Sequence, residues 1–194
     1  MNHQIHSPMD RPTAWNLLTE YTRSDSLLKH ALAIEAAMRH HARRLGQDVE
    51  LWGLTGLLHD FDYERWPNPP EHTREGARIL RDLGVDDEII GAILSHAEWN
   101  QAEFPLDRPL RKTLFAVDEL SGFIVAVAYV RPEHLTGMAP PSVRKKLKQK
   151  SFAAAVSRDD IQRGADLLEL SLDDHIAHAI EALDSIREAL GFAH

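Results

Sequence analysis

The 194-residue chain contains no cysteine. This absence excludes a disulfide scaffold, a thiolate nucleophile, an iron–sulfur cluster and zinc held by cysteine. Any metal site must therefore be built from imidazole and carboxylate groups. Any catalysis by the chain itself must likewise rest on oxygen and nitrogen chemistry.

Basic residues are also in short supply, with 22 Lys and Arg against 30 Asp and Glu, so the formal net charge is −8. A chain of this charge is not attracted to polyphosphate in general, and we expect no stable nucleic-acid binding. The segment from Arg144 to Lys150 departs from this balance, with five Lys or Arg in seven residues. We interpret it as a solvated face, with docking of a polyanionic ligand as the alternative.

No long hydrophobic run is free of charge. The most apolar stretch, Thr113 to Val130, carries Asp118 and Glu119 near its middle, and each would cost a few kcal/mol at the centre of a bilayer. We predict a buried core helix here. The segment Met1 to Arg11 lacks the basic start and apolar run of a signal peptide. We therefore expect a cytoplasmic protein with no membrane partner.

The chain is rich in histidine, with 12 residues, and its length and 43% hydrophobic content suit one domain. Hydrophobic residues recur at helical spacing, and alternating strand-like patterns are nearly absent. We predict an all-α helical bundle that forms a single domain over residues 1–194. The predicted helices run from Ser24 or Asp25 to about Arg44, from Asp48 to His59-Asp60, from Glu71 to Leu83 before Gly84, from Asp86 to His96, from Thr113 to near Pro132, from Asp159 to Leu168 and from Leu172 to Leu190.

Asp118 requires a partner, because an unpaired carboxylate in the middle of an apolar helix is costly. A salt bridge to an arginine is one solution and a bound cation is another. His59 and Asp60 favour the cation, since adjacent side chains at a helix end point about 100° apart and can both reach one cleft. His30, His72 and His96 lie in or beside separate predicted helices, so a bundle could bring all of these groups to one point.

The order of these residues resembles the H…HD…H…H…D pattern of the HD-domain superfamily of metal-dependent phosphohydrolases. Four blocks carry the resemblance to its two-metal subgroup: LLHDFD at 57–62, HTREGA at 72–77, LGVDDEIIGAILSHA at 83–97 and KTLFAVDELSGFI at 112–124. The stretch from Ser142 onward is similar to the tail of an uncharacterised bacterial HD-domain group. We therefore expect an HD metal-binding core over 25–130 and a C-terminal helical extension over 131–194 that covers the bundle.

The resemblance implies a role for each residue of the pattern. The first metal would be held by His30, His59, Asp60 and Asp118, and the second by His72 and His96, with Asp60 as the bridge and principal catalytic residue. One or two divalent ions per chain are implied. Imidazole and carboxylate ligands favour manganese, iron or zinc, with magnesium less suited. Asp62 and Glu119 are candidates to orient a ligand; alternatively, both are solvated or salt-bridged.

The sequence departs from many relatives in one respect. Where those relatives carry a lysine shortly after the His-Asp pair, this chain has Tyr63. A cation that contacts phosphate must come from elsewhere, and Arg65, Arg108 and Arg131 are the candidate substrate-binding residues because each follows a helix that bears a ligand. The alternative is that each is a surface arginine.

Aromatic residues are concentrated in the same loops, and these are Phe61, Tyr63, Trp66, Trp99 and Phe104. They could stack on a nucleobase or seal the open end of the bundle, and we favour the packing role. The remaining eight of the 12 histidines, including His40, His41, His175 and His178, are predicted to be surface residues.

The pattern favours a metal-dependent phosphohydrolase that cleaves a phosphomonoester or phosphodiester, such as a nucleotide, with a metal-bridging hydroxide as nucleophile. The expected partner is thus a small phosphate ester. Two alternatives share the same residues: a di-iron HD-type oxygenase, and a non-catalytic module that binds metal or nucleotide. The sequence does not indicate an oligomeric state.

Overall fold

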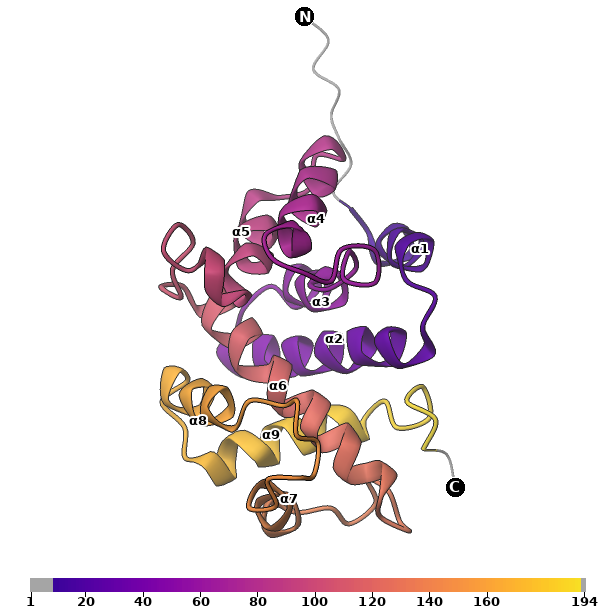
Figure 1. Cartoon of the computed structure of the whole chain (residues 1–194), viewed down its shortest axis with the longest axis vertical. Helices are drawn as coiled ribbons and strands as arrows, with labels where there is room; N and C mark the ends of the chain where they lie inside the picture. The colour runs from indigo at the N-terminus through magenta and orange to yellow at the C-terminus, as the bar shows by residue number, and fades with distance from the viewer. Residues whose placement is uncertain (1–8, 193–194) are drawn as a thin grey trace, which may run out of the picture.

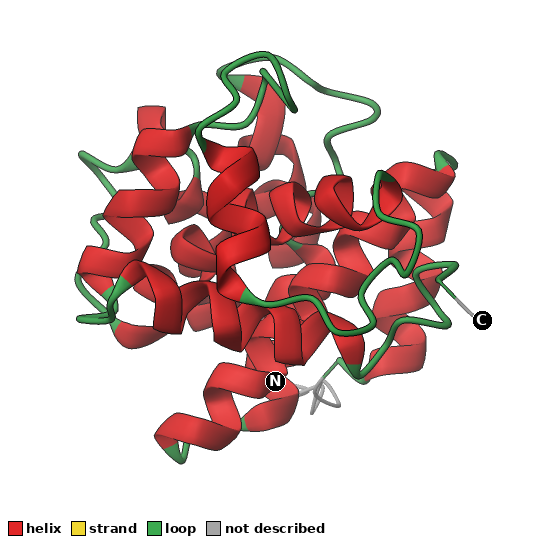
Figure 2. Cartoon of the chain, turned by 90° about the horizontal axis from the view of Figure 1, so that it is seen from below, coloured by secondary structure: helices red, strands yellow, loops and turns green. Residues whose placement is uncertain are grey.

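A computed structural model describes residues 9–192 of the chain. His3, His6 and His194, and most of the segment examined for a signal peptide, lie outside this range. The helices are α1 (Arg11–Tyr21), α2 (Asp25–Leu45), α3 (Val49–Leu58), α4 (Glu71–Asp82), α5 (Asp87–His96), the 3₁₀ helix η1 (Glu98–Asn100), α6 (Pro109–Tyr129), α7 (Pro140–Leu147), α8 (Arg158–Leu167) and α9 (Leu172–Asp184). The described part contains no strand, so the prediction of an all-α fold is confirmed (Figure 2).

Helix α2 runs through the middle of the molecule and separates two hydrophobic cores (Figure 1). On one side, α1, α3, α4 and α5 enclose a core around Leu57, Phe61 and Ile93. On the other side, α6, α7, α8 and α9 enclose a second core around Phe123 and Ile176. Because α6 also packs against α2 and α5, it connects the two halves of the bundle.

Several residues predicted to begin or end helices do so in the structure. Asp48 accepts hydrogen bonds from the N–H groups of Glu50 and Leu51, and Asp86 accepts one from Glu88 N–H. Gly84 has a φ of 71° after the last turn of α4, where a residue without Cβ is favoured. The chain turns there, and this places α5 beside α4.

Three elements differ from the expectation. Helix α1 was not predicted, although Asp10 caps Thr13 N–H and a proline follows in the first turn. Helix α7 was not predicted either; it includes the first part of the basic segment, in which Arg144 and Lys145 are exposed, as expected of a solvated face. Helix α9 ends at Asp184, short of Leu190, because the chain passes into successive turns that return Leu190 and Phe192 to the second core.

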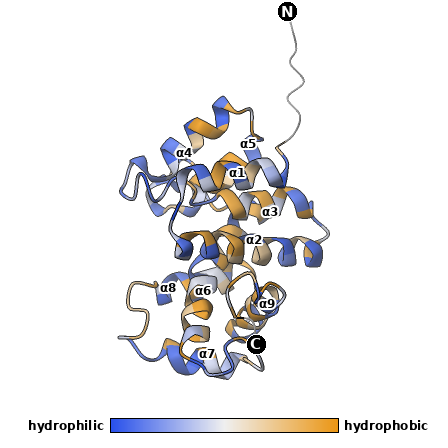
Figure 3. Ribbon diagram, turned by 90° about the vertical axis from the view of Figure 1, so that its right-hand side faces the viewer, coloured by the Kyte–Doolittle hydropathy of each residue, from blue (hydrophilic) through white to orange (hydrophobic). Residues whose placement is uncertain are grey.

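The apolar stretch around Asp118 forms the core helix α6, as predicted. Its buried residues include Leu114, Val117, Leu120, Phe123 and Ile124. No helix within residues 9–192 combines the length and the hydrophobicity needed to cross a bilayer. Helix α3 is coloured as hydrophobic along most of its length, which fits its position between α2 and α5 (Figure 3).

The prediction that the remaining histidines lie on the surface is wrong for His41 and His175, which are 4% and 0% exposed. They belong to a group between α2 and α9, here called the α2–α9 histidine cluster: His40, His41, His175 and His178. The rings of His40, His41 and His178 lie 5.4 to 5.8 Å apart. The error arose because α9 covers the face of α2 that appeared polar in the sequence.

Candidate metal centre

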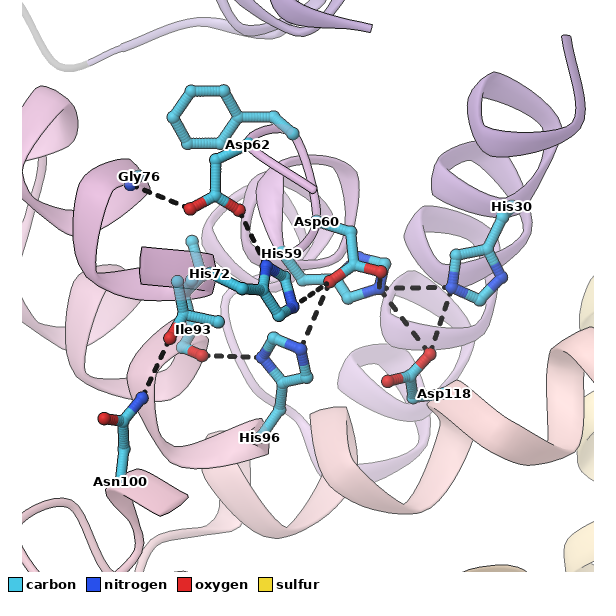
Figure 4. A network of polar contacts seen from close by, with 12 residues as sticks. His30, His59, Asp60, Asp62, His72, Gly76, Ile93, His96, Asn100 and Asp118 are labelled. Carbon is cyan, nitrogen blue, oxygen red and sulfur yellow. Dashed lines mark hydrogen bonds and ion pairs between the residues drawn. The ribbon is translucent and has the colours of Figure 1, made fainter. Parts of the chain in front are cut away.

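The structure brings together all six residues that the resemblance singled out (Figure 4). We call them the His–Asp cluster: His30 from α2, His59 and Asp60 directly after α3, His72 at the start of α4, His96 at the end of α5, and Asp118 from α6. Gly56 permits the close approach of α2 and α3, because a Cβ there would lie 2.7 Å from the carbonyl oxygen of Ile34.

The cluster divides into two groups of three that share one carboxylate. One ligand atom from each of His30, His59 and Asp60 lies within 4.8 Å of the others, and the same holds for Asp60, His72 and His96. Asp118 belongs to the first group, since its Oδ1 lies 3.0 Å from His30 Nε2 and 3.6 Å from His59 Nε2. Asp60 therefore stands between two sets of donors.

The two oxygens of Asp60 face different histidines. Oδ1 lies 3.3 Å from His72 Nε2 and 3.2 Å from His96 Nε2, whereas Oδ2 lies 3.5 Å from His59 Nε2. Oδ1 is buried and has no hydrogen-bond partner among the described residues. A buried, unpartnered oxygen that faces two imidazole nitrogens fits a metal ligand, and a cation held by His72 and His96 would satisfy it.

The orientation of the imidazole rings is set by hydrogen bonds at their outer nitrogens. His59 Nδ1–H donates to the carbonyl of Gly56 at 2.8 Å, and His96 Nδ1–H donates to the carbonyl of Ile93 at 2.6 Å. In each neutral ring the remaining nitrogen, Nε2, is then an acceptor directed into the cluster. This arrangement is typical of histidines that bind metals.

Asp62 performs the corresponding task for His72. Its buried carboxylate accepts a hydrogen bond from His72 Nδ1–H at 3.1 Å and one from Gly76 N–H at 2.9 Å. A Cβ at position 76 would lie 2.8 Å from Asp62 Oδ2, so glycine allows the carboxylate to reach the backbone. Asp62 thus contacts a ring that it was expected to orient, whereas Glu119 accepts a hydrogen bond from Ser157 N–H at the start of α8.

His72 lies at a kink in α4 that the sequence did not reveal. The next residue, Thr73, has a φ of 67°, a left-handed conformation that costs about 1–2 kcal/mol for a β-branched residue. Buried Asn100 donates a hydrogen bond to Thr73 Oγ1 at 2.8 Å and accepts one from Arg74 at 3.0 Å. Asn100 therefore supports the strained segment that aims His72; no residue pattern in the sequence identified this role.

The imidazoles of the cluster stabilise the charged form of its two carboxylates. Burial opposes ionisation of Asp60, but the neighbouring imidazoles of His59, His72 and His96 hold its pKa well below its ordinary value. Burial likewise opposes the charge on Asp118, and the neighbouring imidazoles of His30 and His59 hold its pKa well below that value. Both groups are therefore carboxylates at neutral pH.

The pKa values of His59, His72 and His96 are raised, whereas those of the two carboxylates of the cluster are lowered. Although burial disfavours a charged ring, the carboxylates of Asp60 and Asp62 beside it raise the pKa of His72 to about 9. The pKa values of His59 and His96 are also raised, since burial is outweighed by the charge of Asp60. The carboxylates thus make this point of the fold favourable to positive charge, whether a proton or a metal ion carries it.

The three arginines proposed to bind substrate have other contacts. Arg65 donates to the carbonyl of Glu20 at 2.7 Å and lies 3.9 Å from the centre of the Tyr21 ring. Arg108 pairs with Glu88 at 2.6 Å, and Arg131 donates to the carbonyl of Thr136 at 3.3 Å. Their role toward a substrate stays a prediction.

The aromatic residues of the loops fall into two sets. Phe61 is 1% exposed and belongs to the first core, and Trp66 packs against Tyr21 with ring centres 6.1 Å apart. Tyr63 and Trp99, by contrast, are 38% and 43% exposed, and their rings lie 5.1 and 5.9 Å from the ring of His72. The packing role favoured from the sequence fits Phe61 and Trp66, whereas Tyr63 and Trp99 flank the cluster.

The sequence matches the HD domain family over residues 27–186. The chain belongs to the HD-domain family. The HD domain is typical of a superfamily whose members are generally metal-dependent phosphohydrolases, and the His and Asp groups of the cluster could hold metal. The match extends past residue 130, the end of the predicted core, and includes most of the C-terminal helices.

Similar curated proteins add little about the activity of this HD-domain chain. An uncharacterised protein of Methanocaldococcus jannaschii is 38% identical over 71 residues, or 34% of this chain and 41% of that protein. A tRNA (cytidine(56)-2'-O)-methyltransferase of Thermoplasma volcanium is 29% identical over 87 residues, or 45% of this chain and 25% of that protein. The matched segments thus span less than half of either relative. No solved structure matches the chain significantly.

Proposed function

We propose that this HD-domain protein hydrolyses a small phosphate ester, and specifically a nucleotide, at the His–Asp cluster. The observation that carries the proposal is the shared carboxylate: Asp60 stands between two groups of imidazoles and directs one oxygen toward each. Dinuclear phosphohydrolases need such a bridge, because both ions must act on the same phosphoryl group.

The chain's own residues account for the binding of two divalent cations. His30, His59 and Asp118 would complete one site with Asp60, and His72 and His96 would complete the other. When bound, such a pair of ions neutralises charge on a phosphoryl group and lowers the pKa of a shared water toward neutrality. Asp62 and the backbone carbonyls of Gly56 and Ile93 hold the imidazoles in the tautomer that presents Nε2.

Tyr63 and Trp99 support the choice of a nucleotide over a plain sugar phosphate. Their exposed rings border His72, so a phosphate held at the cluster leaves its organic part close to two aromatic faces. Stacking on such faces contributes about 1–3 kcal/mol per base. The position where many relatives carry a lysine is thus occupied by one of these aromatic residues, Tyr63.

Arg65 can contact a phosphate at the His–Asp cluster only if its side chain changes conformation. Its contacts with the Glu20 carbonyl and the Tyr21 ring must be released before the side chain can turn to a phosphate. Arg108 would likewise have to leave Glu88. We therefore assign most of the charge neutralisation to the cations and retain Arg65, Arg108 and Arg131 as candidates to be tested singly.

The central test combines metal content with turnover. Purified protein is stripped with a chelator, reloaded separately with manganese, iron, zinc or magnesium, and assayed for phosphate release from nucleotides and sugar phosphates. We expect up to two ions at the cluster and metal-dependent release of phosphate from a nucleotide. Full activity in metal-free protein would contradict the proposal. An iron-specific spin-resonance signal with oxygen-dependent turnover would favour the oxygenase, and tight binding without turnover the non-catalytic module.

The nucleotide assignment has a separate test in Trp99→Ala. We expect KM for the best nucleotide to rise by about 5- to 100-fold, the equivalent of losing one stacked base, with little change for glycerol phosphate. Trp66→Ala is the matched control, because that ring packs on Tyr21. Equal effects of Trp99→Ala on both substrates would indicate a structural role for this residue.

A further inference from the structure

The α2–α9 histidine cluster contains a second set of metal-binding side chains outside the His–Asp cluster. One ligand atom from each of His40, His178 and Glu181 lies within 4.8 Å of the others. His178 and Glu181 are three residues apart on α9 and so lie on one face of that helix, opposite His40 on α2. His40 and His178 were predicted as surface residues, and only the packing of α9 on α2 brings them together.

The position along α2 keeps this set separate from the His–Asp cluster. His40 follows His30 by ten residues, which corresponds to about 15 Å along the helix axis and about 80° around it. A metal ion at His40 therefore cannot share ligands with one at His30. The two sites would lie on different faces of the same helix.

The side chains are those that bind zinc and similar first-row ions. Two imidazoles and one carboxylate form a three-residue zinc site that leaves the fourth position to water. His40 Nε2 is buried and has no hydrogen-bond partner among the described residues, so an ion would satisfy it. In a tetrahedral zinc site the ligand atoms lie roughly 3.3 Å apart. Rotation of the exposed Glu181 side chain can bring its carboxylate oxygen from within 4.8 Å of the imidazole nitrogens to this distance.

The histidines of this set are suited to bind an ion without first losing a proton. Burial lowers the pKa of His40, and burial together with the nearby Arg44 lowers that of His178, so both rings are neutral at pH 7. The Glu181 carboxylate acts in the opposite direction on both and supplies the negative charge of the set. The exposed guanidiniums of Arg43 and Arg44 oppose a cation here.

We propose that His40, His178 and Glu181 bind a divalent first-row cation such as Zn²⁺, which cross-links α9 to α2. The site would attach the C-terminal helices to the helix that carries His30. It is independent of the proposed phosphohydrolase activity, because none of its residues belongs to the His–Asp cluster.

The test uses full-length protein with Zn²⁺ alone as the probe. Calorimetric titration should detect one more Zn²⁺ in the wild-type chain than in His178→Gln or His40→Gln. If these variants still bind that Zn²⁺, their affinity for it should be at least about ten-fold lower than that of the wild type. Glu181→Gln should weaken the same binding, whereas Glu188→Gln, which removes an equal charge from the exposed turns after α9, should not. Arg44→Gln should tighten it.

A spectroscopic measurement on wild-type protein keeps the proposal falsifiable if a variant does not fold. In nitrogen-15 spectra of the imidazoles, the resonances of His40 and His178 should shift together on addition of Zn²⁺. Zinc binding that leaves both resonances in place would overturn the proposal, as would equal zinc stoichiometry and affinity in wild type and His178→Gln.

Discussion

The fold contains two groups of histidines, each with members on helix α2, yet their chemistry is opposite. In the His–Asp cluster, the carboxylates of Asp60, Asp62 and Asp118 outweigh the cost of burial, and the pKa of His72 rises to about 9. In the α2–α9 histidine cluster, burial acts almost unopposed and the pKa values of His41 and His175 fall to about 3 and 4. The carboxylate neighbours, and not burial itself, decide the protonation of a buried histidine here.

The two sets of metal-binding side chains therefore differ in their charge before a metal binds. The His–Asp cluster has charge in excess, so it attracts cations strongly, and metal binding there must release protons. The set around His40 and His178 is neutral apart from Glu181, so it would bind an ion more weakly and with less dependence on pH. The predictions below test this difference, from the largest expected effect to the smallest.

Asp60→Ala should have the largest effect, because it removes the bridge and half of the negative charge contributed by Asp60 and Asp118. We expect the loss of both ions from the His–Asp cluster and a fall in turnover of more than about 100-fold, since removing an outer-shell group already costs 10- to 100-fold. Metal analysis and phosphate release measure the two quantities. His178→Gln is the control from the other cluster, and it should leave turnover unchanged.

Asp62→Asn should have an intermediate effect, because the charge is lost and one amide oxygen cannot replace both carboxylate oxygens, which accept from His72 Nδ1–H and Gly76 N–H. We expect about 10- to 100-fold weaker binding of the ion held by His72 and His96, with the ion at His30 and His59 retained. Competition with a chelator measures the affinity. The exposed Asp82→Asn serves as the matched control, and equal behaviour of the two variants would argue against a role for Asp62.

The smallest effect on metal binding and turnover is expected from His41 and His175, whose titration concerns stability in acid. His41 and His175 stay neutral in the fold, with pKa values of about 3 and 4, but take up protons near pH 6.5 when unfolded. Their contribution to stability is therefore present above pH 6.5 and is lost as the pH falls toward 4, by up to about 1.4 kcal/mol per pH unit for each residue.

His41→Leu should make this acid-side loss shallower, as measured by urea unfolding of chelated protein between pH 7 and 4. Met38→Leu, a change in a buried neighbour on α2 that does not titrate, should leave the slope unchanged. The His–Asp cluster has the opposite sign: its raised pKa values stabilise the metal-free fold below pH 6.5, and this stabilisation is lost as the pH rises toward 9. An identical acid slope in His41→Leu and wild type would contradict the assignment.

Much of the fold could be predicted because its signals are local. Asp48 and Asp86 cap the helices that follow them, Gly84 ends α4, and the apolar residues around Asp118 form a core helix. The kink at Thr73 and the support from Asn100 could not be predicted, because a strained φ is maintained by a contact between residues 27 positions apart.

The candidate site, too, could be predicted from the sequence only in part. The order of His30, His59-Asp60, His72, His96 and Asp118 was visible in the chain, and their convergence agrees with it. The sequence was misleading for His41 and His175, because a polar helix face identifies a surface only when no other element packs on it. Trp99 and Phe61 show a similar limit: both are aromatic loop residues, yet one flanks His72 and the other fills a core.

The sequence by itself determined the chemistry available to this protein: the absence of cysteine restricts metal ligands to imidazole and carboxylate, and the ends of α3, α4 and α5 carry four of those groups. The tertiary structure decided which groups meet. It directs the two oxygens of Asp60 toward different histidines and places α9 over His40 and His41. Such relations depend on distances between residues far apart in the chain, and these distances arise only when the helices pack.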